Sequence, residues 1–317
     1  MPFDMNRLSR REFVALTAGG AAAAPLASKR QSALHAAGLT AQDVIDRIKK
    51  NVGVEWKADT VDTFKAGDPV TVVTGVVTTS MATLAALRFA VKAGANLIIT
   101  SGPTFYARAD APTAPPRRET MAGAGTPSPA GAYPNDRIFA AKNELIRTER
   151  LVIWRFSDHW RARTPDPLVQ GLADALGWSR FATADDPALV SIPATTLGAL
   201  ASTIKKKLNA RGGIRVVGDP QTAIRKVALL PATTAIDAAL KALPAVDAIV
   251  AGEVREWESV EYARDTVTAG GKKGLILIGR VLSEGPSMNA CAQWLKVIVP
   301  ELKTSWVPIG DPYWRPA

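Results

Sequence analysis

The chain has 317 residues and an ordinary globular composition, with 47% hydrophobic and 21% charged residues. This balance excludes a mainly disordered, collagen-like or coiled-coil protein. No apolar run reaches the ~18 residues of a membrane-spanning helix, so we expect no stable membrane span. One cysteine and two histidines exclude an internal disulfide, a cysteine-rich zinc site and a site built from several imidazoles.

The formal net charge of +10 makes nucleic-acid binding conceivable. Residues 1–30 hold five basic and two acidic residues, so the rest of the chain carries +7. The remaining basic residues are dispersed, and their densest cluster, at 205–207, falls on an expected helix and is not interleaved with aromatic residues. A solvated helix face explains this cluster better than a nucleic-acid site.

The N-terminus resembles an export signal. The hexapeptide Ser-Arg-Arg-Glu-Phe-Val at 9–14 precedes a weakly apolar stretch over 15–26. Paired arginines before a short apolar region are typical of the twin-arginine pathway. The alternative, a basic first helix of the domain, is disfavoured by the glycines and proline of this stretch. We therefore expect residues 1–37 to be a signal peptide and linker, and the protein to be periplasmic or secreted.

The rest of the chain alternates strands and helices. Thr40 is the expected N-cap of the first helix, which runs through Ile48. Hydrophobic periodicity predicts strands over 70–78, 96–100, 151–156, 214–217, 226–230, 248–251 and 275–279. It predicts further helices over 81–93, 135–147, 168–176, 197–208, 235–243, 257–269 and 287–297.

This order predicts an α/β protein with two related α/β lobes, mixed or parallel sheets, and a ligand cleft at the strand carboxyl ends. We expect the first lobe at 38–178, with a Pro/Gly-rich loop at 107–133. An inter-lobe segment follows at 179–225, where the rhythm of the elements changes, and the second lobe spans 226–317.

Several common catalytic machineries are missing from the sequence, including a dinucleotide-binding glycine motif, a Walker loop, a nucleophile elbow and the zinc-protease helix motif. Four short polar clusters instead follow expected strands, at 100–106, 156–161, 251–257 and 279–284. Strand ends that converge make a plausible common pocket.

These clusters resemble the motifs of the Nif-three-like dinuclear metal centre proteins, a family also described as type-two GTP cyclohydrolases. An exported subgroup has Thr-His-Glu-Pro-Thr-Phe-Tyr-Asn-His, Phe-His-Asp-His-Trp-His, Gly-Glu-x-Arg-Glu-Trp-Glu and Gly-His-x-x-Ser-Glu. The matching segments here begin at Thr100, Phe156, Gly252 and Gly279. The resemblance covers about 40–315, and it implies two divalent ions per chain and a ring-like homo-oligomer, a hexamer in relatives.

The histidines that hold metal in the family are mostly replaced in this chain. The former ligand positions carry Ser101, Arg108, Ser157, Arg161 and Arg280. The ligands that the resemblance leaves are Asp158, His159 and Glu284. The other pocket residues that it implies are Thr100, Thr104, Tyr106, Glu253 and Trp257. A guanidinium group stays protonated and cannot coordinate a cation, so three donors among arginines do not suit two ions.

Ordinary structural roles remain open for most of these residues. Glu284 can simply favour a helix start, and His159 can be a hydrogen-bonded structural residue. Asp158 and His159 are adjacent, so on a strand only one of them would face the pocket. Trp257 and Tyr106 can serve in packing as readily as in binding a substrate.

Two main hypotheses follow from the resemblance, and whether the protein is an enzyme stays open between them. The first is an exported protein with a degenerate dinuclear site, non-catalytic or binding a small anion through its arginines, with no cofactor. The second is a metal-dependent hydrolase that retains one divalent ion on the three remaining donors. A nucleic-acid binder is a third, supported by charge alone.

Overall fold

The computed structural model describes residues 38–106, 136–183, 185–314 and 316. The expected signal peptide and linker, the Pro/Gly-rich loop and Arg108 lie outside these residues. Among the described residues, no helix combines the length and the apolar character needed to cross a bilayer.

The elements alternate as the sequence predicts. The strands are β1 (Phe64–Ala66), β2 (Val76–Thr79), β3 (Leu97–Thr100), β4 (Val152–Arg155), β5 (Leu189–Thr196), β6 (Arg215–Val217), β7 (Ala223–Thr233), β8 (Ala248–Glu253), β9 (Gly274–Leu277) and β10 (Thr304–Trp306). The α-helices are α3 (Ala41–Asn51), α4 (Leu84–Lys92), α5 (Arg137–Thr148), α6 (Asp158–Arg161), α7 (Pro167–Leu176), α8 (Leu197–Lys207), α9 (Ile236–Ala242), α10 (Glu261–Thr268) and α11 (Arg280–Ile298). Short 3-10 turns lie at Ser179–Phe181 and Leu243–Ala245, and a π-helical turn, η4, at Glu256–Val260.

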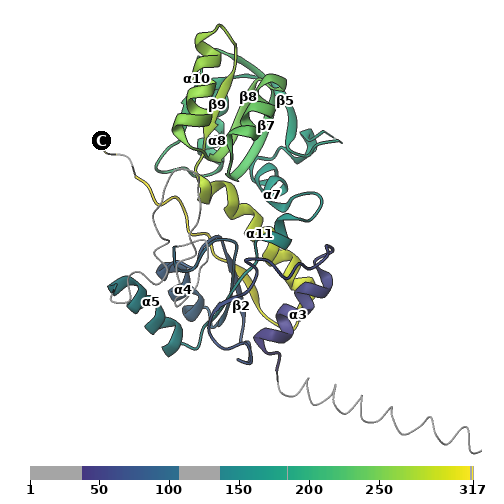
Figure 1. Ribbon diagram of the computed structural model, residues 1–317, viewed down its shortest axis with the longest axis vertical. Helices are drawn as coiled ribbons and strands as arrows, with labels where there is room; N and C mark the ends of the chain where they lie inside the picture. Colours follow the sequence, from purple (N-terminus) through teal and green to yellow (C-terminus); the bar gives the residue numbers. More distant parts are fainter. Residues whose placement is uncertain (1–37, 107–135, 184, 315, 317) are drawn as a thin grey trace, which may run out of the picture.

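Two five-stranded mixed sheets define two α/β lobes, so the predicted fold class is confirmed. The first sheet has the order β1-β4-β3-β2-β10, with only β1 antiparallel to its neighbour. The second has the order β5-β7-β8-β9-β6, with three parallel central strands and an antiparallel strand at each edge. In Figure 1 the second lobe lies at the top and the first at the bottom, with α7 and α11 between them.

Strand pairing divides the chain differently from the predicted domain boundaries. β5 and β6 fall within residues 179–225, yet both are edge strands of the second sheet. β10 lies near the C-terminus, yet it pairs with β2 in the first sheet. The second lobe is therefore inserted into the first. Periodicity predicts β6 but misses β5, which has many half-buried and exposed residues, and β10, which has only three residues.

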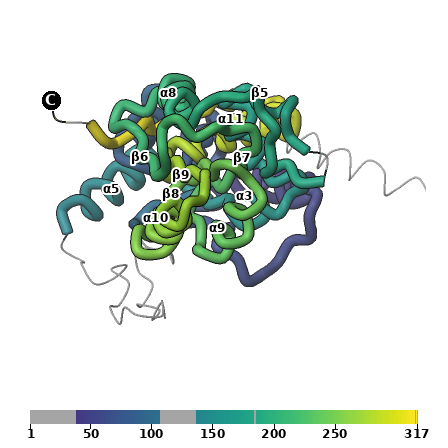
Figure 2. The backbone as a smooth tube through the Cα atoms, turned by 90° about the horizontal axis from the view of Figure 1, so that it is seen from above, coloured from purple at the N-terminus to yellow at the C-terminus, as the bar shows by residue number. Residues whose placement is uncertain are grey.

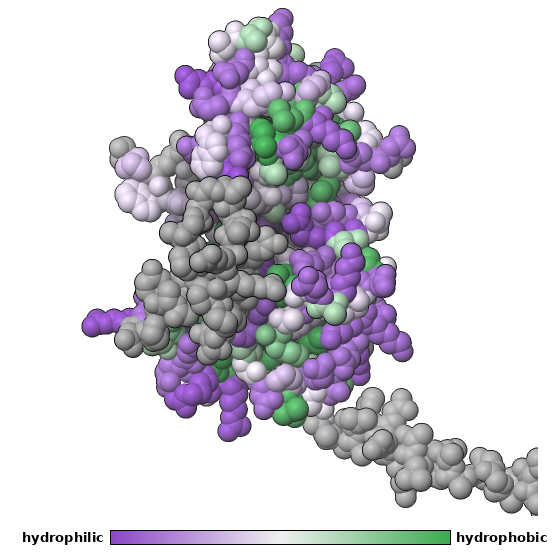
Figure 3. Space-filling model, viewed as in Figure 1, coloured by the Kyte–Doolittle hydropathy of each residue, from purple (hydrophilic) through white to green (hydrophobic). Residues whose placement is uncertain are grey.

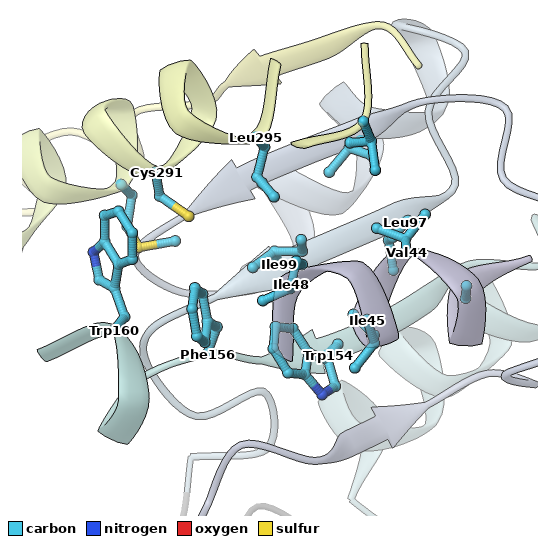
Figure 4. Close-up of a cluster of buried hydrophobic side chains, with 14 of the residues drawn as sticks. Val44, Ile45, Ile48, Leu97, Ile99, Trp154, Phe156, Trp160, Cys291 and Leu295 are labelled. Carbon is cyan, nitrogen blue, oxygen red and sulfur yellow. The ribbon is translucent and has the colours of Figure 1, made fainter. Parts of the chain in front are cut away.

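Helices cover both faces of each sheet. On one face of the first sheet, Val44, Ile45 and Ile48 of α3 pack with strand residues such as Ile99, and Figure 4 shows Leu295 of α11 in the same cluster. In the second lobe, seen from above in Figure 2, α8 lies on one side of the strands and α9 and α10 on the other. The outer surface in Figure 3 is largely hydrophilic with scattered apolar patches.

The start of α3 shows how local sequence sets an element. The Thr40 hydroxyl accepts a hydrogen bond from the Asp43 backbone N–H at 3.2 Å, and the Asp43 carboxylate accepts one from the Thr40 backbone N–H at 2.9 Å. This capping box satisfies two donors that a helix start otherwise leaves open. It begins the helix at the predicted place.

Candidate functional site

The polar residues after β3 lock the ends of two strands together. The Thr100 and Ser101 hydroxyls both donate to the carbonyl oxygen of Ser80, at 3.1 and 3.2 Å. Ser80 follows β2, the parallel neighbour of β3. Both hydroxyls therefore hold the loop geometry at this end of the first sheet.

Thr104 and Tyr106, further along the same loop, contact α5. The Thr104 carbonyl accepts a hydrogen bond at 2.5 Å from Lys142 Nζ, which also lies 4.4 Å from the centre of the Tyr106 ring. Partial burial and the charge of Asp136 raise the pKa of Tyr106. This part of the predicted pocket is thus an aromatic and lysine contact with α5.

His159 lies in a buried network that the sequence did not reveal. Its Nδ1 is 2.8 Å from a carboxylate oxygen of Asp62, and its Nε2 accepts the backbone N–H of Lys57 at 2.8 Å. Because Lys57 can only donate, Nε2 must be the unprotonated nitrogen and Nδ1 must carry the proton. Trp56 stacks on the ring with 3.6 Å between centroids. Both ring nitrogens are occupied, so the structure corrects the expectation of a metal ligand here.

Asp62 also fixes the turn that carries the Phe156–Arg161 motif. Its carboxylate accepts backbone N–H bonds from Ser157, Asp158 and His159 at 2.6, 3.0 and 2.9 Å. Those donors form the start of α6, where a negative charge is favourable. A carboxylate 95 residues or more away in sequence from its partners leaves no spacing pattern, which is why sequence reasoning missed it.

Asp158 begins α6, so it and His159 follow one another on a helical turn and do not alternate along a strand. Its Oδ2 accepts the Thr60 hydroxyl at 2.8 Å and the Val61 backbone N–H at 3.0 Å. Burial raises the pKa of Asp158, but these two hydrogen bonds and the charge of Arg155 outweigh burial and leave the pKa below its usual range. Asp158 is therefore a stable carboxylate bound to the 60–61 loop.

Glu284 is the buried carboxylate at the junction of the lobes. It lies in the second turn of α11, with 6% of its side chain exposed, and its Oε1 accepts Arg280 Nε at 2.9 Å. Burial raises the pKa of Glu284, while the charges of Arg280, Arg161 and Arg155 act in the opposite direction. Three guanidinium groups thus act on one buried carboxyl group.

These three arginines, which we call the arginine cluster, come from both lobes. Arg155 is buried at the end of β4 and donates from Nε to the Ser101 carbonyl at 3.2 Å. Arg161 is exposed on α6, within electrostatic reach of Asp166. Arg280 opens α11, with 36% of its side chain exposed. Arg280 contacts Glu284 directly, and Arg155 and Arg161 act on the same carboxyl group through their charges.

The donor set does not fit a metal centre. Within the described parts of the chain, no group of three or more His, Cys, Asp and Glu side chains could hold a metal ion. In particular, Asp158, His159 and Glu284 do not come together as ligands. Protonated guanidinium groups cannot replace the missing donors, since they offer no lone pair to a cation.

Glu253 and Trp257 stand at the rim of the second sheet. Glu253 and Arg280 line one cavity of about 550 Å³ at the carboxyl ends of β8 and β9. This position matches the cleft expected for an open α/β sheet. Trp257, 73% exposed on η4, has the Arg255 guanidinium 5.8 Å from its ring centre. It does not line this cavity.

Comparison with solved structures identifies the same fold in several bacterial proteins. The Staphylococcus aureus protein SA1388 aligns with a TM-score of 0.65 and 16% identity over 88% of this chain and 100% of its own. A Bacillus cereus protein related to NIF3 aligns with 0.61 and 14% over 88% and 99%. The protein ybgI, of unknown function, aligns with 0.59 and 17% over 86% and 100%. No family model and no curated protein matches the sequence.

Proposed function

We propose that this chain is a NIF3-type protein in which the arginine cluster replaces the dinuclear metal site, and that it binds a small oxyanion there without metal-dependent catalysis. The single observation behind this proposal is the set of three guanidinium groups that act on the buried Glu284. The fold shared with a protein related to NIF3 supports the family assignment.

The chemistry of the cluster favours a phosphate-like or carboxylate ligand. Arginine presents a planar fork of N–H donors that matches two oxygens of such an anion. Arg280 and Arg161 are accessible to solvent, and Arg280 also lines the 550 Å³ cavity. An incoming anion can therefore compete with Glu284 for the Arg280 side chain.

Calorimetric titration with inorganic phosphate, with the protein freed of chelators and divalent ions, tests anion binding. We expect phosphate to bind, and to bind about tenfold or more weakly to Arg280→Ala, because this variant lacks the guanidinium group that lines the cavity. Arg264→Ala removes an exposed arginine of α10 that has a similar helical ion pair with Glu261, so it is the matched control. Phosphate binding that is absent, or equal in both variants, contradicts the proposal.

Elemental analysis of the same protein tests the metal half of the proposal. We expect essentially no bound zinc, manganese or iron after incubation with each ion and desalting. One ion per chain, lost on changing Glu284→Gln and Asp158→Asn, would instead support the hydrolase that retains a single ion. Two bound ions per chain would show that the protein has a dinuclear centre and would contradict the proposal that arginines replace it.

The proposal also includes export and assembly. Export rests on the twin-arginine pattern of the N-terminus, and assembly rests on the resemblance to the Nif-three-like family. We infer that residues 1–37 direct the chain through the twin-arginine pathway to the periplasm or beyond, and that the mature protein forms a homo-oligomer, a hexamer if it follows its relatives. Fusing residues 1–37 to a reporter protein tests export: Arg10→Lys with Arg11→Lys should keep the fusion in the cytoplasm. Unchanged export of that variant contradicts the twin-arginine assignment.

A further inference from the structure

A second cavity lies beside α11, where the two lobes meet. It has a volume of about 430 Å³, within the range of small-molecule sites. Ser80, at the end of β2, and Trp306, in β10, line it from the first lobe. Leu208, directly after α8, lines it from the second lobe. The cavity is therefore built from both lobes.

This cavity adjoins the 550 Å³ cavity that Arg280 lines, with which it shares Val281, Leu282 and Asp311, but Arg280 and Glu284 themselves are not part of its lining. Val281, Leu282 and Gly285 line the cavity, whereas Arg280 and Glu284 pair with each other. At 100° per residue, Arg280 and Glu284 lie within about 40° of one another. The three cavity residues lie about 100–200° around the helix from Arg280. A ligand in the cavity would not occupy the proposed oxyanion site.

Most of the cavity wall is apolar. Besides Val281 and Leu282, the wall includes the side chains of Leu208, Pro308, Ile309 and Trp306. The indole Nε1–H of Trp306 is buried and has no hydrogen-bond partner among the described residues. An apolar wall of this kind favours a hydrocarbon or ring system over water.

One end of the cavity carries positive charge. Lys207 and Arg211 line it, from the end of α8 and the loop that follows. Lys207 Nζ donates to the carbonyl of Leu176, whereas Arg211 is exposed and makes no ion pair within the described part of the chain. The acidic residue of the lining, Asp311, accepts the backbone N–H groups of Gly212 and Tyr313 at 2.7 and 3.0 Å.

We propose that this cavity binds a small monoanionic amphiphile, with its apolar body against Trp306, Leu208 and Ile309 and its carboxylate or similar anion at Arg211. Apolar walls beside a cationic rim complement such a molecule in both hydrophobicity and charge. The volume limits the body to roughly the size of a medium-chain acyl group or a small ring system. This site is independent of the proposed oxyanion function.

Titration of the full chain with butanoate, hexanoate and octanoate tests the apolar half of the proposal. We expect affinity to rise by about fifteenfold for each pair of added methylenes, because each buried methylene favours binding by about fourfold. Octanamide, which has the same body without the charge, should bind more weakly than octanoate. Excess phosphate should leave octanoate binding unchanged, which separates this site from the arginine cluster.

Two variants locate the site. Arg211→Glu should weaken octanoate binding at least tenfold, whereas Arg88→Glu makes the same charge change on the exposed face of α4 and should not alter it. Ala175→Trp adds bulk to an exposed residue of the lining and should also weaken binding. Circular dichroism checks that the variants fold. Octanoate that fails to bind, affinity that ignores chain length, or binding that survives both cavity variants would overturn the proposal.

Discussion

Asp62 is the residue on which the motif around His159 depends most directly. It is 3% exposed and accepts hydrogen bonds from three successive backbone N–H groups and from His159 Nδ1. We predict that Asp62→Ala lowers the free energy of unfolding by about 3 kcal/mol, since it leaves several buried donors without a partner. Denaturant unfolding followed by circular dichroism measures this loss.

The neighbouring Asp59 provides the matched control for this prediction. It is an exposed aspartate on the same loop. Asp59→Ala removes an equal charge without exposing any buried donor, so we expect a change within about 0.5 kcal/mol. Similar losses in the two variants would show that Asp62 acts through its charge alone and not through the buried network.

Burial of Glu284 predicts the sign of one pH dependence in the stability of the protein. Its pKa is raised in the folded state, chiefly by burial, so folding favours the protonated form. The stability that it contributes is fully present below the pKa of an unfolded glutamate and is lost as pH rises through the folded pKa. We predict that the melting temperature of wild type relative to Glu284→Gln falls as pH rises from about 4 upward. If the melting temperature of wild type relative to Glu284→Gln instead rises with pH, the arginine cluster lowers the pKa of Glu284 more than burial raises it.

The sequence predicts the arginine cluster and Glu284 better than it predicts the network around His159. Arg280, Arg161 and Glu284 each belong to a motif at a strand end, and the charges of both arginines act on the Glu284 carboxyl group. The sequence allows His159 to be either a metal ligand or a structural residue. The choice depends on Asp62 and Lys57, which are remote in sequence and belong to no motif. Long-range hydrogen bonds of this kind leave no periodic signal in one chain.

Among the elements, α11 departs furthest from its predicted bounds. The expected helix over 287–297 in fact begins at Arg280, and Gly285 and Pro286 lie inside it. Sequence reasoning stops at that dipeptide because proline removes a helical hydrogen bond and glycine lowers helix propensity. The longer helix places Glu284 one turn after Arg280, which allows their hydrogen bond.

Close packing of β8 against β7 and α11 requires a glycine at 252. A Cβ there would lie 2.3 Å from the Ala232 carbonyl oxygen and 2.4 Å from Ser283 Oγ. We predict that Gly252→Ala destabilises the protein by about 3 kcal/mol or prevents folding, because backbone must move to admit the methyl group. Thermal unfolding, or recovery of soluble protein, measures the effect.

Gly285 provides the contrasting substitution on α11. A Cβ at this position meets atoms no closer than 3.7 Å, which is ordinary van der Waals contact. Alanine also favours helix over glycine, so Gly285→Ala should leave stability unchanged or raise it by up to about 1 kcal/mol. If Gly285→Ala lowers stability as much as Gly252→Ala, the space around the added Cβ does not determine the effect of the substitution.

At the scale of the whole molecule, the chain leaves the first lobe, builds the second and then returns. β10 completes the first sheet after every strand of the second has formed in sequence order. On the way back α11 packs against both lobes: the Met288 carbonyl accepts the Thr78 hydroxyl at 2.6 Å, and Ser283 Oγ accepts the Ala232 backbone N–H at 2.9 Å. The first lobe is therefore not a contiguous segment, whereas the five strands of the second sheet are consecutive in the chain.

This connection predicts that the two lobes unfold in one cooperative transition. Trp154 and Trp160 are buried in the first lobe and Trp178 is buried in the second, so tryptophan fluorescence reports mainly on the first lobe, while far-ultraviolet circular dichroism reports on the helices of both. Because α11 belongs to the core of the first lobe and also contacts β7 of the second, we expect loss of either lobe to weaken the other. We expect the two signals to give midpoints that coincide within about 1 °C on heating. A fluorescence transition well separated from that of circular dichroism would show that α11 does not couple the lobes.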